Sequence, residues 1–127
     1  MNKNKLVIFV AGRIPSKKNS KQIVGRGKFV RLIASQAYLS WKKQVSEQVQ
    51  SQLTTNFLGK SVKVDITINF PDNRRADLTN KAESLMDMLV DEKVIDDDKW
   101  QIASVVNLTG ELDKTKEVGA TITITEL

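Results

Sequence analysis

The sequence contains no cysteine and no histidine among its 127 residues. Without cysteine, the chain has no disulfide framework, no thiolate zinc site and no cysteine nucleophile. Without histidine, it has no imidazole metal ligand and no Ser-His-Asp triad. Any catalysis must therefore depend on carboxylates, lysines, hydroxyl groups or a bound metal ion.

Long apolar runs are also missing, because no run approaches the roughly 20 residues that a membrane-spanning helix needs. The first residues, MNKNKLVIFVAG, combine a charged start with a short apolar stretch. Residues 6–11 are few and rich in branched side chains, which favours a buried strand over a signal peptide. We therefore expect a soluble, cytoplasmic protein with no membrane partner. The length predicts one domain over residues 1–127.

Acidic residues are missing from the first 43 positions, which hold eleven lysines and arginines. Residues 77–98, by contrast, hold eight of the 15 acidic residues and only two lysines. A net charge of +5 indicates a polyanionic partner, with nucleic acid the first candidate, although lysines also simply solvate surfaces. Cations for phosphates beside carboxylates for metal ions are what a nuclease requires.

The apolar periodicity predicts an α+β fold. A continuously apolar run predicts a first strand over 6–11, buried on both faces. Residues 12–27 indicate a loop or loose hairpin, followed by a short strand over 28–33. Later strands are predicted over 61–70, 101–108 and 118–125. The result is a mixed sheet of about four to five strands.

Two main helices are predicted to cover this sheet, over residues 35–53 and 78–90, because apolar residues recur there at spacings of three or four. Ser35 is a suitable N-cap for the first helix, and Thr79 or Asp77 for the second. Trp41 falls on the apolar stripe of the first helix, which favours a core position over base stacking.

Asp77 and the pair Asp97 and Asp98 fall where predicted elements begin or end, which is where folded domains often present functional side chains. Mg²⁺ prefers oxygen ligands and typically takes one or two carboxylates together with substrate phosphate oxygens. It lowers the pKa of a bound water and stabilises charge on phosphorus oxygens. Spacing alone is weak evidence, because acidic clusters also serve as solvated surface or helix-capping charges.

Four segments in order, IPSKKNSKQI, NFPDNRRADLTN, KAESLMDML and VIDDDKW, span nearly the whole chain. This ordered set resembles the RusA family of Holliday-junction resolvases, which prophages often encode. The resemblance implies a homodimeric, Mg²⁺-dependent endonuclease, with Mn²⁺ as a second possible cofactor, in a bacterial or phage-infected cell. Its implied substrate is a four-way DNA junction, cut in paired strands during recombination and repair.

The family's site resembles a DLDN motif, then a lysine one helical turn into the helix, then a DD pair about twenty residues on. Carried over, the first aspartate falls on Asp77, the asparagine on Asn80 and the late pair on Asp97 and Asp98. The resemblance implies that both members of this pair bind metal, and Asp98 matches the catalytic member.

Two residues depart from the family pattern: Thr79 replaces its second aspartate and Glu83 replaces its lysine. These two positions are neighbours on one helical edge. We therefore hypothesise that Glu83 supplies the missing ligand to a metal set with Asp77 and Asp98; a plain surface glutamate is the alternative. Thr79 is better explained as a helix cap than as a ligand. Asp87, four residues after Glu83, is expected to face solvent.

The family lysine has two possible replacements, either Lys81 or a lysine of the SKKNSK loop. That loop is also expected to hold DNA phosphates, unless it is merely a solvated charged loop. Arg74 and Arg75 lie three and two residues before Asp77 and are expected to line the same cleft. The loop residues assigned to DNA binding are Lys17, Lys18, Asn19, Ser20 and Lys21.

The departures also support a second hypothesis, a junction-binding protein of the same fold that has lost catalysis. A third is an endonuclease for another branched DNA, such as a fork or a flap. Asp91 and Glu92, near the predicted end of the second helix, oppose its macrodipole and receive no predicted role.

Overall fold

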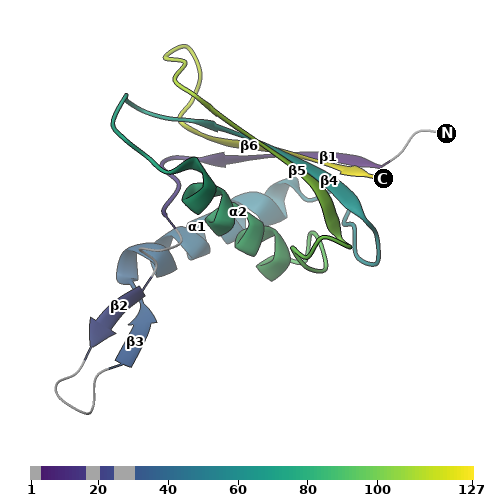
Figure 1. Cartoon of the computed structure of the whole chain (residues 1–127), viewed down its shortest axis with the longest axis horizontal. Helices are drawn as coiled ribbons and strands as arrows, with labels where there is room; N and C mark the ends of the chain where they lie inside the picture. The colour runs from purple at the N-terminus through teal and green to yellow at the C-terminus, as the bar shows by residue number, and fades with distance from the viewer. Residues whose placement is uncertain (1–3, 17–20, 25–30) are drawn as a thin grey trace.

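The computed structural model describes residues 4–16, 21–24 and 31–127. A four-stranded sheet carries both helices on one face, and a two-stranded hairpin projects away from this body (Figure 1). The elements, in chain order, are β1 (Lys5–Ala11), β2 (Lys21–Val24), β3 (Arg31–Ala34), α1 (Gln36–Gln52), β4 (Val62–Asn69), α2 (Leu78–Asp91), β5 (Ala103–Glu111) and β6 (Gly119–Glu126).

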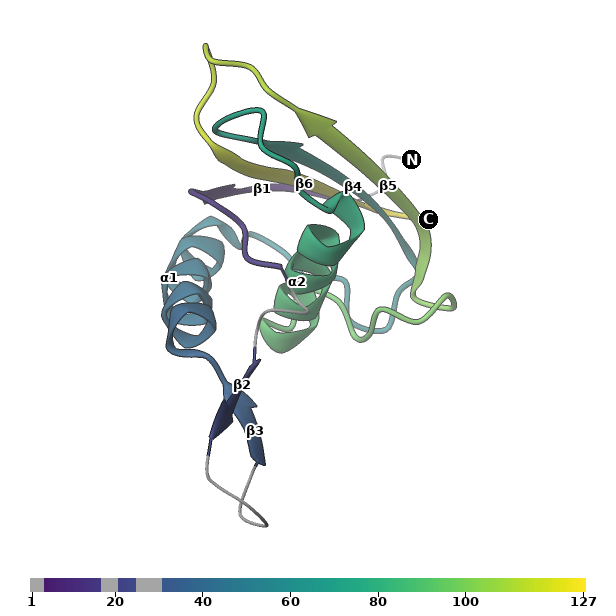
Figure 2. The ribbon, with the colours of Figure 1, turned by 60° about the vertical axis from the view of Figure 1, so that its left-hand side comes forward.

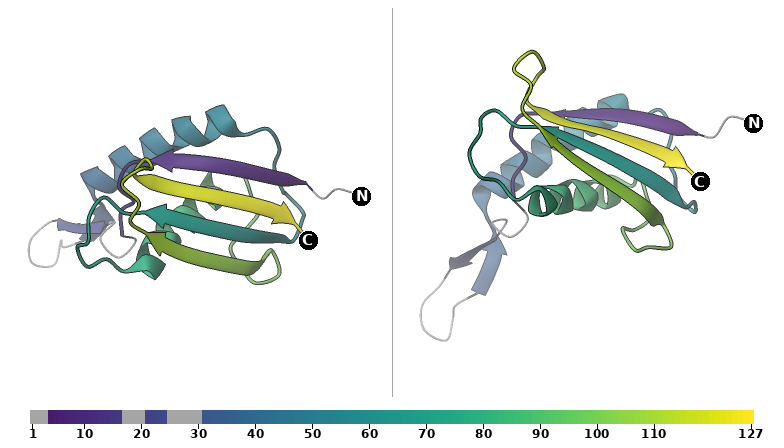
Figure 3. Two further views of the ribbon diagram at one scale, coloured as in Figure 1. Left: turned by 90° about the horizontal axis from the view of Figure 1, so that it is seen from above. Right: turned by 45° about the horizontal axis from the view of Figure 1, so that its top comes forward.

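The main sheet has the strand order β1-β6-β4-β5, and its strands lie side by side when seen from above (Figure 3). β4 pairs in parallel with β5, whereas β6 pairs antiparallel with both β4 and β1. The parallel pair requires a crossover connection, which α2 provides. A single mixed-sheet α+β domain with two helices is the predicted fold class, and the structure confirms it.

The core lies between the sheet and the two helices. In β4 the side chains of Val62, Val64, Ile66 and Ile68 are all buried, as the alternating sequence predicts. From α1, the side chains of Tyr38, Trp41, Val45 and Val49 pack into the same core. Trp41 is therefore a core residue, which confirms that prediction.

The prediction that the first strand is buried on both faces is wrong. Leu6, Ile8 and Val10 of β1 are buried, but Val7 is 52% exposed. The reason is that β1 is an edge strand of a sheet whose helices cover only one face (Figure 3). An apolar run can therefore alternate in burial even where the sequence does not alternate in polarity.

The hairpin alternative for residues 12–27 is confirmed in part, because β2 pairs antiparallel with β3. The predicted short strand over 28–33 corresponds to β3, which starts three residues after the predicted start. This pair forms a sheet of its own beyond the start of α1 (Figure 2). Residues 17–20, which include four of the predicted DNA contacts, lie outside the described residues.

The two acids without a predicted role dock the helices against each other. Asp91 pairs with Lys42 at 2.7 Å, and the Glu92 carboxylate accepts a hydrogen bond from the Ser46 hydroxyl, also at 2.7 Å. These partners across the helix interface thus offset the unfavourable place of both acids at a helix C-terminus. In the part of the chain that the structure describes, neither helix is long and apolar enough to cross a membrane.

Candidate functional site

The start of α2 is organised by Asp77, which is its N-cap. The Asp77 carboxylate accepts hydrogen bonds from the backbone N–H of Thr79 at 3.1 Å and of Asn80 at 3.4 Å. These N–H groups have no partner within the helix, so an aspartate at this position stabilises the helix start. Of the two caps that the sequence allows, the structure selects Asp77.

Thr79 and Asn80 orient this carboxylate further through their side chains. The Thr79 hydroxyl donates to Asp77 Oδ1 at 2.8 Å, and the Asn80 amide donates to Asp77 Oδ2 at 2.7 Å. Asp77 rather than Thr79 is therefore the N-cap, and Thr79 is the second residue of the helix. Its hydroxyl instead helps to fix the rotamer of Asp77.

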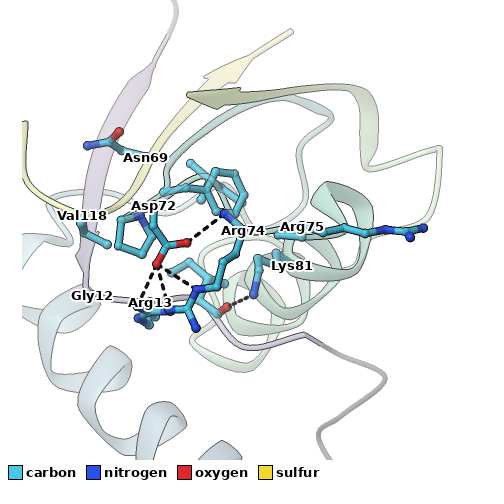
Figure 4. A pocket seen from close by; sticks show the side chains of 13 residues that line it. Gly12, Arg13, Asn69, Asp72, Arg74, Arg75, Lys81 and Val118 are labelled. Carbon is cyan, nitrogen blue, oxygen red and sulfur yellow. Dashed lines mark hydrogen bonds and ion pairs between the residues drawn. The ribbon is translucent and has the colours of Figure 1, made fainter. Parts of the chain in front are cut away.

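On one side of α2 lies a cationic pocket of about 210 Å³, lined by Arg13, Arg74, Arg75 and Lys81 together with Asp72 (Figure 4). Asp72 Oδ2 accepts from Nη2 of Arg74 at 2.8 Å and from Nη2 of Arg13 at 3.3 Å. The Arg75 side chain extends away from this pair. Arg13 and Arg74 therefore come from separate segments and converge on one carboxylate.

The charges in this pocket perturb one another. Side-chain and backbone hydrogen bonds from Arg74 lower the pKa of Asp72 to about 2, so this carboxylate is ionised at all physiological pH values. Lys81 Nζ donates to the Ile14 carbonyl at 2.7 Å. Burial, with a smaller contribution from Arg13, lowers the pKa of Lys81. Lys81 is thus partly withdrawn from water, with its charge near that of Arg13.

On the other side of α2 lies an acidic groove between this helix and β5. It brings together Glu83 and Asp98, which are 15 positions apart in the sequence and were both predicted as metal ligands. Thr79 lines the same groove, so the two departures from the family pattern do share one edge of the helix. The other lining residues are Ala82, Met86, Asp87, Val106 and Leu108.

Asp87 is one of the residues that sequence reasoning missed. It was expected to face solvent, but it is half-buried and lines the groove with Glu83 and Asp98. The available signal was its spacing, because Thr79, Glu83 and Asp87 follow each other at intervals of four and share one face. Each interval adds about 6 Å along the helix axis, so these side chains form a row.

The acidic side chains lie along a line and do not converge on one point. Within residues 4–16, 21–24 and 31–127, no three acidic side chains lie close enough together to hold a metal ion as one cluster. Asp77 is not among the residues that line the groove. The structure therefore places two of the four proposed ligands, Glu83 and Asp98, along one groove and Asp77 at the helix start beside it. The fourth, Asp97, does not line the groove.

The other two acids of the DDD run serve the loop before β5. Asp97 Oδ1 accepts from the backbone N–H of Asp98 at 2.7 Å, and Asp96 accepts from the backbone N–H of Gly59. Asp97 therefore orders the backbone that presents Asp98. Asp96 joins this loop to the connection between α1 and β4.

The predicted cations divide between described and undescribed parts of the chain. Arg74 and Arg75 line the cationic pocket, as does Lys81, which points away from Glu83 because residues two apart on a helix differ by about 200°. Lys21 begins β2. Arg13 was not predicted as a site residue. Its part in the pocket becomes visible only through its ion pair with Asp72, which is far away in the sequence.

The chemistry of the groove fits a hard divalent cation. Its polar lining consists of carboxylates and a hydroxyl, all oxygen donors, and the chain offers no thiolate or imidazole. Mg²⁺ needs only one or two carboxylates, because waters and phosphate oxygens complete its coordination. Two neighbouring carboxylates of this groove are therefore enough to hold such an ion.

Fold and site together define a class: an α+β domain in which one helix separates a cationic pocket from an acidic groove, as a nuclease requires. The comparison with known families agrees, since residues 13–125 match the family described as Endodeoxyribonuclease RusA. The chain belongs to this family. No curated protein matches the sequence.

Proposed function

We propose that this protein is a metal-dependent endonuclease that resolves four-way DNA junctions by hydrolysing phosphodiester bonds in paired strands. The observation that supports it most is the shared groove of Glu83 and Asp98 beside the capped Asp77, in a chain of the RusA family. Mg²⁺ is the proposed cofactor, and Mn²⁺ is the alternative. Branched DNA is the proposed partner.

In the proposed site, Asp98 and Glu83 would hold the metal ion, with Asp77 as the third candidate. A bound Mg²⁺ would supply an activated water and would neutralise charge on the phosphate. The protein's own contribution is orientation. Asp97 fixes the backbone at Asp98 at 2.7 Å, and Thr79 and Asn80 hold both oxygens of Asp77. Such outer contacts set the direction of ligand lone pairs.

The cationic pocket would hold a backbone phosphate next to the scissile one. Arg13 and Arg74 are already drawn together by Asp72, so their donors converge before DNA arrives. Guanidinium groups bind phosphate through paired donors, which gives direction as well as charge. Lys81 would add the positive charge that the family's lysine supplies from the position that Glu83 occupies in this chain. Its amine lies on the pocket side of α2.

A homodimer is part of this proposal, because a four-way junction has two-fold symmetry and two strands must be cut. A symmetric dimer would present one acidic groove to each of the two strands. Light scattering of the free protein and of its junction complex measures this directly. Two protein chains for each junction is the expected stoichiometry.

The decisive experiment uses a synthetic four-way junction with Mg²⁺ and compares the native chain with Asp98→Asn, Asp77→Asn and Glu83→Gln. We expect paired, symmetric nicks from the native chain and none from Asp98→Asn. If Glu83→Gln cuts at the native rate while both aspartate variants are inactive, Glu83 is no ligand. Forks, flaps and linear duplex in the same assay identify the preferred substrate class.

A second candidate function is a junction-binding protein without catalysis. The observation in its favour is the pair Thr79 and Glu83, where the family has aspartate and lysine. Binding of the junction with no cleavage in either Mg²⁺ or Mn²⁺ would establish it. The same gel-shift and cleavage assays on one preparation separate the two functions.

A further inference from the structure

Trp100 is the most exposed large hydrophobic side chain of the described residues, at 75%, whereas the others lie between 40% and 52%. A buried tryptophan removes 150–250 Å² of surface from water, so leaving the ring in solvent forgoes a large stabilisation. The chain's second tryptophan, Trp41, is 9% exposed. The exposure of Trp100 therefore comes from its position in the fold and is not shared by the other tryptophan.

The backbone that carries Trp100 is held firmly while its ring is free of the core. The Lys99 carbonyl accepts from the backbone N–H groups of Ile102 and Ala103, each at 2.9 Å. The Trp100 carbonyl accepts from the Ser104 hydroxyl at 2.9 Å, and the Gln101 carbonyl accepts from the Ser61 hydroxyl at 2.7 Å. A hydrogen-bonded turn thus presents the indole outward at low entropic cost.

This turn adjoins the acidic groove. Trp100 follows Asp98 by two residues, so their backbones are within about 7 Å of each other. Lys99 lies between them in the sequence and is exposed, so the same turn also carries a positive charge. An aromatic ring with an adjacent cation, next to the acids of the groove, matches the way proteins bind unpaired bases and their phosphates.

We propose that Trp100 stacks on a base exposed at the branch point of the DNA, and so determines the preference for branched over linear substrates. This inference rests on the proposed function. In a linear duplex both faces of each base are covered by neighbours, so an indole has no face to stack on. At a branch point stacking is interrupted, and one base face becomes available. The ring therefore adds affinity only for branched DNA.

The test compares Trp100→Leu, which keeps apolar bulk, with Trp100→Phe, which keeps an aromatic face. Affinity is measured for a four-way junction and a linear duplex, with a chelator present so that nothing is cut. We expect Trp100→Leu to lose roughly tenfold in junction affinity and less than about twofold on duplex, while Trp100→Phe loses little. Leu39→Ala, at an exposed apolar residue of α1, is the matched control and should change neither value.

A second readout places the contact. With 2-aminopurine at the branch point, the native chain should quench its emission and Trp100→Leu should not. Equal losses on junction and duplex, or unchanged quenching in Trp100→Leu, would overturn the proposal. Acrylamide quenching of Trp100 fluorescence, measured without DNA, gives a third test. If Trp100 is protected from acrylamide, and more so at higher protein concentration, a second copy of the chain covers the ring and the proposal is overturned. If the native chain itself prefers no branched DNA, the proposed function fails; if it prefers the junction equally well without Trp100, only this inference fails.

Discussion

The cationic pocket and the acidic groove flank the same helix, yet they are built in different ways. In the pocket, charges of opposite sign are paired: Asp72 links Arg13 and Arg74 at distances of 3.3 and 2.8 Å. In the groove, charges of one sign follow each other along α2 at an interval of four residues. Two cations of the pocket are therefore paired with an anion although the pocket stays net positive, whereas the groove gathers acidic side chains only.

This difference bears on the kind of ligand that each region would bind. In the pocket, Arg13 and Arg74 are already paired with Asp72, and a phosphate could take the place of that carboxylate. A row of carboxylates carries mutual repulsion that a divalent cation relieves. Because α2 forms one wall of each, a phosphate held in the pocket and a cation held in the groove would lie on opposite sides of one helical start. Asp77 marks that start.

The largest expected effect separates the two regions by function. Asp98→Asn should lower cleavage of a saturating four-way junction by at least about a hundredfold, because even outer contacts to metal ligands are worth ten to a hundredfold. Its affinity for the junction should stay within about twofold of the native value, since every cation is kept. Arg74→Gln should do the reverse, with weaker binding and normal cleavage at saturation. Single-turnover rates and gel shifts, on variants with unchanged thermal midpoints, measure both.

If Asp98→Asn weakened binding as much as Arg74→Gln, the division of labour across α2 would be refuted. If Arg74→Gln cut slowly even at saturation, Arg74 would belong to the chemistry of the scissile phosphate.

The next effect tests whether Glu83 compensates for Thr79. Thr79→Asp and Glu83→Lys each restore one family residue, and the double variant restores both. We expect each single change to slow junction cleavage by about tenfold or more. The double variant should recover most of the rate, because residues that share one function are coupled by about 0.5–3 kcal/mol. Single-turnover cleavage rates for the four proteins give the coupling.

Additive effects in that cycle would show that Thr79 and Glu83 act independently. In that case the hydrogen bond from the Thr79 hydroxyl to Asp77, at 2.8 Å, would be the whole role of the threonine.

A smaller effect concerns binding alone. Replacing Arg13, Arg74 and Lys81 together by glutamine should flatten the dependence of log affinity on log salt by about 0.9 for each DNA phosphate that the variant no longer neutralises. The matched control neutralises Lys60, Lys63 and Lys114, which lie outside the pocket and change the net charge equally. Equal slopes for the two triple variants would mean that the pocket binds no phosphate.

Much of the fold follows from local pattern. The alternation in β4 and the apolar stripes of the two helices predict their elements to within one or two residues, because burial on one face imposes the period. The open face of β1 could not be predicted in this way. It depends on both helices covering the same face of the sheet, which leaves the other face of β1 open (Figure 3), and this packing has no local signal in the sequence.

The site was predictable where its residues are linked by sequence spacing. Thr79 and Glu83 share an edge by helical geometry alone, and the same rule would have included Asp87. Arg13 could not be found, because its partner Asp72 is 59 positions away. Only the meeting of the segment after β1 with the segment after β4 brings the two together. Long-range convergence of this kind leaves no local signal.

The smallest expected effects lie within the pocket. Asp72→Asn removes its one internal anion and should raise affinity for the junction by a few-fold, most clearly at low salt. Asp65→Asn is the control, because it removes an equal charge from a carboxylate on β4, 3.7 Å from Lys63. Since the pKa of Asp72 is about 2, the difference between the two variants should not vary between about pH 5 and pH 9. Equal increases in junction affinity in both variants would show that the effect comes from net charge and not from the pocket.

Lys81 provides the pH-dependent counterpart. Folding lowers its pKa below the ordinary value of 10.5, so the folded chain releases this proton before the unfolded chain does. At neutral pH the charged Lys81 therefore lowers the free energy of unfolding. This destabilisation fades as the pH rises through the lowered pKa toward 10.5, where both states have lost the proton. Arg13→Gln removes the neighbouring charge and should raise the pKa of Lys81 slightly, because burial remains the larger cause. NMR titration of the lysine side chains measures this shift, and an unchanged Lys81 pKa would show that the two cations do not share one pocket in solution.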